Sequence, residues 1–432
     1  MMPGPFAGEA RSRLLPMSVP FRYFGAAVVF QILAWTLLAR HADQLAGFAG
    51  GPSPLLGALH LVTLGVLAMT ACGASLQLLP IATRQPVRSV AAAKLAWWLL
   101  VAGVVLFALG ALRYHPPTMG VGALVALLGL AVYAWLLAEN LRRARGMRVV
   151  VAHAWVACCA LLLTLASGFA LAQGYVHGFR FDRAALALAH LTLAAYGFMG
   201  MLALGLSYFL LPMFALCPAP GPRSGYASLG AAASAIVIVV IGQLSEAGPG
   251  PLGVAALLGL AAALSHIVPM ELALRRRLRP ALSPSFLLVR VSWAMLLASL
   301  VVALASALGW GYPRVAPLFG LLLVPGWLLS FNLAVLQRIV PFLASVHAYG
   351  SGRGSTLPST LTSEPLLAAH RALHLLALAG LLLAVALDIT WLARSATLVG
   401  LAGALAFAAF FLNVVQRLRA ARTQPPTTGE SP

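Results

Sequence analysis

The sequence contains very little charge. Charged residues make up 9% of its 432 residues, and only nine are acidic. A water-soluble protein has about 25% charged residues, so most of this surface must face lipid. Hydrophobic residues make up 61% of the chain, in long runs rich in Leu and Ala that lack the strict alternation of a membrane β-barrel. The sequence therefore predicts an all-α protein that crosses a bilayer many times.

Cysteine is also scarce. The chain has four cysteines, all in or beside apolar segments, and none forms a C-x-x-C pair. This pattern excludes a disulfide framework or a cysteine-based zinc site and indicates small buried hydrophobic residues. A cleavable signal peptide is not indicated either, because the first apolar run begins near Phe24, after a basic stretch that contains proline.

Twelve apolar segments are long enough to span a membrane. Between them, Gly, Pro or charged residues mark turns. We predict a cytoplasmic N-terminal segment over 1–21, a twelve-helix transmembrane domain over 22–418 and a disordered cytoplasmic tail over 419–432. A loop rich in Ser, Gly and Thr is expected over 348–364. The expected helices cover 22–40, 52–80, 90–112, 118–140, 149–173, 183–214, 225–245, 250–274, 283–309, 314–344, 366–390 and 393–416.

The basic residues are distributed unevenly between the loops. The net charge is +19, but the arginines form short clusters between apolar runs, which favours a membrane protein over a nucleic-acid-binding protein. With the N-terminus inside, twenty of the 28 Lys and Arg residues lie on the cytoplasmic side and six on the other. Arg290 and Arg338 fall inside spans. The sequence thus predicts that both termini are cytoplasmic, in a membrane of the bacterial inner type.

The second and sixth spans share a pattern at a fixed offset of 132 residues. The two glycines in each span allow neighbouring helix backbones to approach closely. The proline at the cytoplasmic end of each span is expected to stop the helix. The tenth span ends in a weaker version, with Gln337, Ile339, Val340 and Pro341. We therefore predict three four-helix units arranged around an axis. The residues repeated in the second and sixth spans are Gly65, Met69, Gly73, Ser75, Leu78, Leu79 and Pro80, which align with Gly197, Met201, Gly205, Ser207, Leu210, Leu211 and Pro212.

Ten histidines are present, and several lie within spans. His153, His266, His370 and His374 fall in the cytoplasmic thirds of their helices, and the sequence leaves their role open. His370 and His374 have an i, i+4 spacing that can hold a metal. At the start of a basic, interfacial helix, we expect instead that they reach toward the interface.

His60 and His190 lie deeper. Each is about eight residues into its helix from the non-cytoplasmic side, roughly 10–12 Å below the helix start. Ionisable residues at this depth usually face a cavity, a partner or a ligand, and neutral imidazole is a common axial ligand of haem iron. His60 is displaced by two residues relative to the repeat, so the pair can meet at a shared axis. Separate hydrogen bonds to neighbouring helices are the alternative.

The twelve spans and these motifs resemble subunit I of the haem–copper oxidases. The similarity lies in His60-Leu61 with Gly65 and Gln77-Leu78-Leu79-Pro80, and in His190-Leu191 with Gly197 and Tyr208-Phe209-Leu210-Leu211-Pro212. The resemblance implies a bundle with pseudo-threefold symmetry. It also implies that His60 matches the ligand of the low-spin haem and that His190 matches a histidine that binds copper in true oxidases. The NnrS-type membrane proteins, linked to nitric-oxide tolerance, are a further relative to consider.

The chain departs from the oxidase pattern at several positions. The seventh span (225–245) has no histidine, and the tenth has only Phe319 and Gly320 near the depth where the family places ligands. The spans also lack embedded acids, since Glu139 and Glu271 lie near cytoplasmic helix ends. We therefore expect neither oxygen reduction, proton pumping nor the family's copper.

Three functional hypotheses follow. The first is one haem b held by His60, with His190 as second ligand, for electron transfer or nitric-oxide-related sensing and tolerance. The second is a transporter or an accessory assembly protein without a cofactor, with Pro325-Gly326 as the candidate for an unwound helix. The third is a purely structural partner of a respiratory complex.

Overall fold

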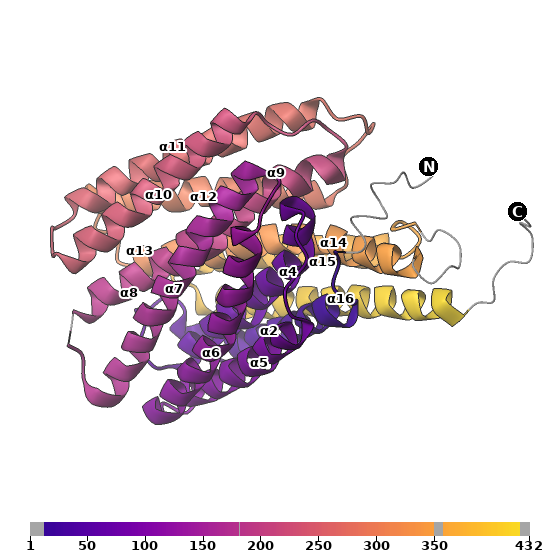
Figure 1. The fold of residues 1–432 in the computed structure, drawn as a ribbon. Helices are drawn as coiled ribbons and strands as arrows, with labels where there is room; N and C mark the ends of the chain where they lie inside the picture. Colours follow the sequence, from indigo (N-terminus) through magenta and orange to yellow (C-terminus); the bar gives the residue numbers. More distant parts are fainter. Residues whose placement is uncertain (1–12, 181, 350–356, 424–432) are drawn as a thin grey trace, which may run out of the picture.

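The computed structural model describes residues 13–180, 182–349 and 357–423. Within these ranges the chain is helical, with no β-strand, and twelve helices are long and apolar enough to cross a membrane. Figure 1 shows them as one bundle of roughly aligned helices. The chain is therefore a multi-pass, all-α membrane protein, which confirms the predicted fold class.

The helix boundaries follow the predicted spans closely. The third span agrees at both ends, whereas the first helix begins four residues earlier, at Ser18, and the last continues to Thr423 into the predicted tail. The rest of that tail, 424–432, lies outside the described residues. The spans are α2 (Ser18–Arg40), α3–η2–α4 (Pro54–His60, Leu61–Ala68, Met69–Thr83), α5 (Val90–Leu112), α6 (Pro116–Arg142), α7 (Arg148–His177), α8–η3–α9 (Arg183–Thr192, Leu193–Gly200, Met201–Ala215), α10 (Pro222–Leu244), α11 (Gly250–Arg275), α12 (Ser285–Ala307), α13–η4–α14 (Val315–Leu321, Leu322–Leu329, Ser330–Tyr349), α15 (Glu364–Leu387) and α16 (Thr390–Thr423).

Three of these spans contain a π-helix at the same position. The segments η2, η3 and η4 each cover eight residues, and each ends twelve residues before Pro80, Pro212 or Pro341. The first two are separated by the predicted offset of 132 residues and the last two by 129. The repeat between the second and sixth spans is therefore confirmed, and the structure extends it to the tenth.

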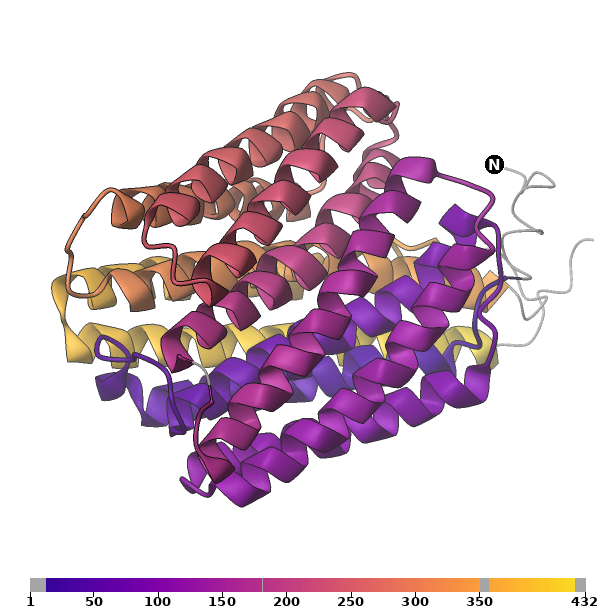
Figure 2. The same ribbon diagram turned by 60° about the vertical axis from the view of Figure 1, so that its left-hand side comes forward.

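The remaining helices follow the same threefold order. After each central span comes a closely packed hairpin, α5–α6, α10–α11 or α15–α16, and the three spans α7, α12 and α2 pack between one hairpin and the next central helix. In Figure 1 the α10–α11 hairpin lies along the top and α5 and α6 along the bottom, and Figure 2 shows the same separation from the side. We call α2 with α3–α4 and α5–α6 the first unit, α7 with α8–α9 and α10–α11 the second, and α12 with α13–α14 and α15–α16 the third.

One glycine in each π-helix allows the central helix to approach its neighbour. A Cβ on Gly65 would lie 2.7 Å from the Phe30 ring of α2, and one on Gly197 would lie 2.7 Å from Ala160 of α7. Gly326 is equivalent, 3.0 Å from Met295 of α12. A larger side chain at any of these positions would push two helices apart.

The prolines at the ends of the central spans do not stop the helices as predicted. Helix α4 continues past Pro80 to Thr83, and α9 continues past Pro212 to Ala215. Proline removes one backbone donor but still has helical φ, so the last turn can continue. The helices end where Arg84 and Leu216, also 132 residues apart, adopt left-handed φ of 58° and 53°.

Packing around the central helices differs between their two ends. The C-terminal halves of the three spans, α4, α9 and α14, are largely buried, whereas α13 has no buried residue. A Cβ on Gly320 would meet nothing within 4 Å. Pro325-Gly326 remains helical inside η4, so the predicted unwound segment is absent. The third central span is therefore packed much more tightly in α14 than in α13.

Candidate functional site

His60 is the last residue of α3, directly before the first π-helix. Its Nδ1 lies 3.0 Å from the carbonyl oxygen of Leu56, one turn earlier. Because a carbonyl only accepts, Nδ1 carries the proton and Nε2 holds a free lone pair. The ring packs on Phe107 of α5, with centroids 4.4 Å apart, and is half-buried. A histidine held in this way is arranged as metal-ligating histidines usually are.

His190 lies on α8, three residues before Leu193, where the second π-helix begins. Its Nδ1 is 3.2 Å from the hydroxyl of Ser167 on α7. That hydroxyl donates to the Leu163 carbonyl oxygen at 2.8 Å, so it must accept from His190. Gly168 provides the room, since a Cβ there would lie 2.7 Å from the His190 ring. His190 therefore also presents an unprotonated Nε2.

The two histidines are held by different hydrogen bonds. The alternative prediction, separate hydrogen bonds to neighbouring helices, holds for His190, which contacts Ser167 on α7. It does not hold for His60, which bonds to Leu56 of its own helix. In the described part of the chain, neither Nε2 has a hydrogen-bond partner. Both histidines are half-buried.

A cationic side chain lies at the N-terminal end of the second central helix. Arg183, at the start of α8, donates to the hydroxyl of Tyr175 at 3.3 Å. Its Nη1 also lies 3.6 Å from a Cβ built on Gly51, in the loop that leads to α3. The N-terminal ends of the first two central helices thus meet beside an arginine. Phe319 and Gly320, the residues expected near this depth in the tenth span, lie on helix α13.

No protein-family model matches the chain, and no curated protein is significantly similar to it. The oxidase resemblance remains a prediction from sequence motifs. Any function must therefore be argued from the site itself.

The prediction that His370 and His374 reach toward the membrane interface is wrong. Both are buried and point into the third unit. The Nδ1 of His370 donates to the carbonyl oxygen of Gly403 at 2.9 Å, and the Nε2 of His374 lies 2.8 Å from the Ser330 hydroxyl. The prediction placed this helix start at the interface because the neighbouring Arg371 is charged. Arg371 is itself largely buried, and its Nη1 donates to Gln337 Oε1 at 3.4 Å.

A second histidine cluster was not anticipated from the sequence. His153 of α7, Tyr208 of α9 and His266 of α11 are buried in the second unit, with ring centroids 5.8 Å apart for His153 and Tyr208 and 4.9 Å for Tyr208 and His266. His153 Nε2, Tyr208 OH and His266 Nδ1 all lack a hydrogen-bond partner. The two histidines are far apart in sequence, so only the packing of α7 and α11 on α9 brings them together.

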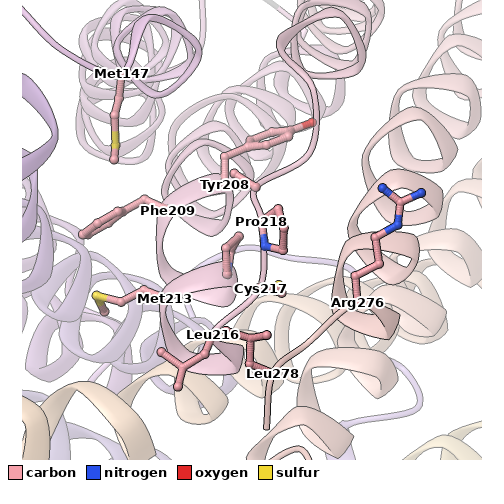
Figure 3. A pocket seen from close by; sticks show the side chains of 11 residues that line it. Met147, Tyr208, Phe209, Met213, Leu216, Cys217, Pro218, Arg276 and Leu278 are labelled. Atoms are coloured by element: carbon pink, nitrogen blue, oxygen red, sulfur yellow. The ribbon is translucent and has the colours of Figure 1, made fainter.

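A cavity of about 590 Å³ opens beside this cluster. Tyr208 forms part of its wall, and Figure 3 shows the sulfur-bearing side chains of Met147, Met213 and Cys217 around it, with Arg276 on the opposite side. Cys217 lies between two spans, where partial burial raises the pKa of its thiol. The cavity is therefore mainly apolar, rich in sulfur, and placed at the end predicted to be cytoplasmic.

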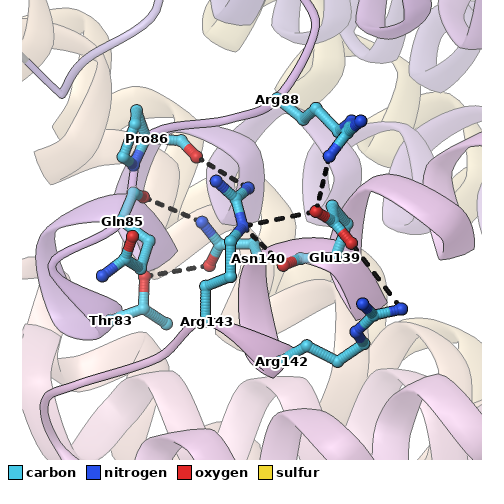
Figure 4. A network of polar contacts seen from close by, with 8 residues as sticks. All are labelled: Thr83, Gln85, Pro86, Arg88, Glu139, Asn140, Arg142 and Arg143. Carbon is cyan, nitrogen blue, oxygen red and sulfur yellow. Dashed lines mark hydrogen bonds and ion pairs between the residues drawn. The ribbon is translucent and has the colours of Figure 1, made fainter.

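The equivalent end of the first unit is closed by polar contacts (Figure 4). Asn140 accepts a hydrogen bond from Thr83 at 2.9 Å and donates to the Gln85 carbonyl oxygen at 2.8 Å. Glu139 pairs with Arg88 at 2.9 Å and with Arg143 at 3.4 Å. The space left there is only about 10 Å³.

Proposed function

We propose that this protein binds one haem b between His60 and His190 and serves in electron transfer within the membrane. The observation that supports it is the pair of unprotonated Nε2 atoms on neighbouring central helices, each with its Nδ1 held by a hydrogen bond. Such a bond fixes the tautomer and ring orientation that an iron ligand needs. Two neutral imidazoles are a common axial pair for haem.

The surroundings also fit a porphyrin. Helix α13, at the same end of the third central span, has no buried residue, and a Cβ on its Gly320 would meet nothing within 4 Å. Arg183 lies near this end and offers a positive charge for the carboxylates of the macrocycle. His60 and His190 would hold the iron, and Phe107 would keep the His60 ring in place.

The role follows from the number of protein ligands. A haem supplies one-electron redox chemistry, and two histidines leave no open position for oxygen. Loss of one ligand would leave a face that nitric oxide can occupy, so a nitric-oxide-related role needs His190 to dissociate. The protein would act with a redox partner or with other respiratory membrane subunits. We further propose a bacterial inner membrane with both termini cytoplasmic, on the basis of the arginine distribution.

The test is a reduced-minus-oxidised optical spectrum of the full chain, purified from haem-replete cells. We expect a low-spin haem b spectrum. His60→Ala should abolish it, and His190→Ala should convert it to a high-spin form that binds nitric oxide. The matched control is His115→Ala, because His115 lies in a loop and bonds locally to Thr118.

Two results would overturn the proposal. One is purified wild-type protein without a Soret band. The other is a spectrum unchanged by His60→Ala. If the purified protein has no chromophore and takes up a labelled substrate in proteoliposomes, the transporter hypothesis replaces the haem proposal.

A further inference from the structure

The second histidine cluster contains three buried polar atoms without partners on three different helices. His153 and His266 are fully buried and Tyr208 nearly so. Ser224 lies near the Tyr208 hydroxyl, and the proton of its own hydroxyl goes to the Gly221 carbonyl oxygen at 2.9 Å. A buried polar group without a partner is costly, by about 1–3 kcal/mol, so three together indicate a missing ligand.

The hydrogen bonds of the two rings identify which nitrogens are free. His153 Nδ1 lies 2.9 Å from the Val149 carbonyl oxygen and must donate to it. His266 Nε2 lies 3.1 Å from Ser207 Oγ, whose proton goes to the Leu204 carbonyl oxygen at 2.7 Å. His266 Nε2 is therefore also a donor. The unpaired atoms, His153 Nε2 and His266 Nδ1, carry lone pairs only, and a ligand there must accept electron pairs.

We propose that His153 Nε2 and His266 Nδ1 bind one copper(I) ion, with Tyr208 OH beside it. Imidazole nitrogens suit copper, and sulfur ligands select its monovalent state. Met147, Met213 and Cys217 line the adjacent cavity, which reaches Tyr208. Met270 is fully buried one helical turn after His266 on the same face of α11. The sulfur atoms would capture the ion and pass it to the histidines.

Charge also favours a monovalent ion. Within the described residues, no group of three or more His, Cys, Asp and Glu side chains is placed to hold a metal. Glu271 of α11 is occupied by Arg290, with contacts of 2.7 and 3.0 Å. Neutral ligands leave the full charge of the ion uncompensated in a buried site, and the cost of burial rises with that charge. Copper(I) leaves one positive charge where zinc would leave two.

The first unit shows that this cluster is not a general feature of the repeat. At the equivalent helix contact, Gly73 packs on Tyr23 as Gly205 packs on His153. Tyr23 OH donates to the Ala93 carbonyl oxygen at 2.7 Å, and Tyr133 OH bonds Ser75 at 2.7 Å. Both phenols have partners there, whereas the histidines of the second unit keep unused lone pairs. The site is separate from His60 and His190 and does not depend on the haem proposal.

The experiment is an anaerobic titration of the full chain, purified through a tag without histidine, with copper(I) in competition with bathocuproine disulfonate. We expect one tightly bound ion per chain. His153→Gln and His266→Gln should each weaken binding at least tenfold while gel filtration shows an unchanged folded protein. His370→Ala, an equally buried histidine in the third unit, should bind copper like the wild type.

Three results would overturn the proposal. If the wild type holds no more copper than the double variant His153→Gln/His266→Gln, the cluster contains only buried water. If His370→Ala loses as much affinity, the ion lies elsewhere. If zinc displaces copper(I) at equal concentration, the assignment to a soft monovalent ion is wrong.

Discussion

The first and second units share one plan but end differently. In the first, Tyr23 and Tyr133 have hydrogen-bond partners and the space beside α4 is about 10 Å³. In the second, His153 and His266 keep unpaired nitrogens and the cavity beside α9 is about 590 Å³. The two units share the π-helix, the hairpin and the glycines of the repeat. Their side chains differ, and they determine whether the C-terminal end of the central helix is closed by packing or borders a cavity. Of these two units, the second is the one with a wide cavity beside its central helix.

The hairpins should differ most in their tolerance of added volume. A Cβ on Gly103 of α5 would overlap the backbone of Ala126 on α6, and the equivalent residue of α10 is Ala235. Gly103→Ala should therefore destabilise the protein by about 1–3 kcal/mol, seen as a lower thermal unfolding midpoint in detergent. Gly230→Ala is the control, because a Cβ there meets nothing within 4 Å. Equal midpoints for the two variants would refute the close packing of α5 on α6.

Removal of one hydroxyl should have opposite effects in the two units. Tyr133→Phe loses the bond to Ser75 and should cost about 1 kcal/mol. Tyr208→Phe in copper-free protein removes a buried hydroxyl that has no partner, so stability should stay the same or rise slightly. Thermal unfolding of both variants measures the difference. A larger loss for Tyr208→Phe would mean that its hydroxyl is bonded without the metal.

Cys217 reports whether the cavity of the second unit is open. Burial raises the pKa of this thiol, so at pH 7 it holds less reactive thiolate than an ordinary cysteine. Its rate of alkylation by a charged maleimide should rise about tenfold per pH unit from pH 7 to 8 and continue to rise above pH 9. The rate is measured against Cys217→Ser. A plateau below about pH 8.5 would contradict the raised pKa, and labelling only in inverted vesicles would establish the orientation.

The smallest effects are expected at the equivalent acids Glu139 and Glu271. Glu139 contacts three arginines, of which Arg88 is largely exposed, and Glu271 pairs with Arg290 alone. Solvent screens such pairs, so Glu139→Gln and Glu271→Gln should each cost less than about 1 kcal/mol. The loss should shrink further in high salt, as unfolding at two ionic strengths would show. If the loss of stability for Glu139→Gln did not depend on salt, the network in Figure 4 would be shielded from solvent.

Much of the fold could be predicted because it depends on local sequence. Long apolar runs define the spans, and the shared glycines and prolines revealed the repeat of the second and sixth helices. The tenth span was harder to align, because Ala334 replaces the glycine at Gly73 and Gln337 is one position out of register with Gln77. Its Gly326 and Pro341 still follow the repeat.

The sites were less predictable because they depend on packing between distant helices. The depth of His60 and His190 indicated a shared space, but only the bonds to Leu56 and Ser167 show which nitrogens are free. The sequence analysis did not predict the cluster around Tyr208. His153 and His266 lie close to the positions that the repeat makes equivalent to Tyr23 and Tyr133. This equivalence can be recognised only after α2 is aligned with α7.

Each π-helix also holds surplus chain without changing the faces of the two halves of its span. In a π-helix the backbone bonds reach five residues instead of four, so its wider turns take up more residues for about the same rotation. Deletion of one residue from 61–68 would therefore restore an ordinary helix and leave His60 on its present face relative to Gly73 and Ser75. A single codon in each central helix thus alters the local backbone bonding, while the side chains before and after it keep their directions.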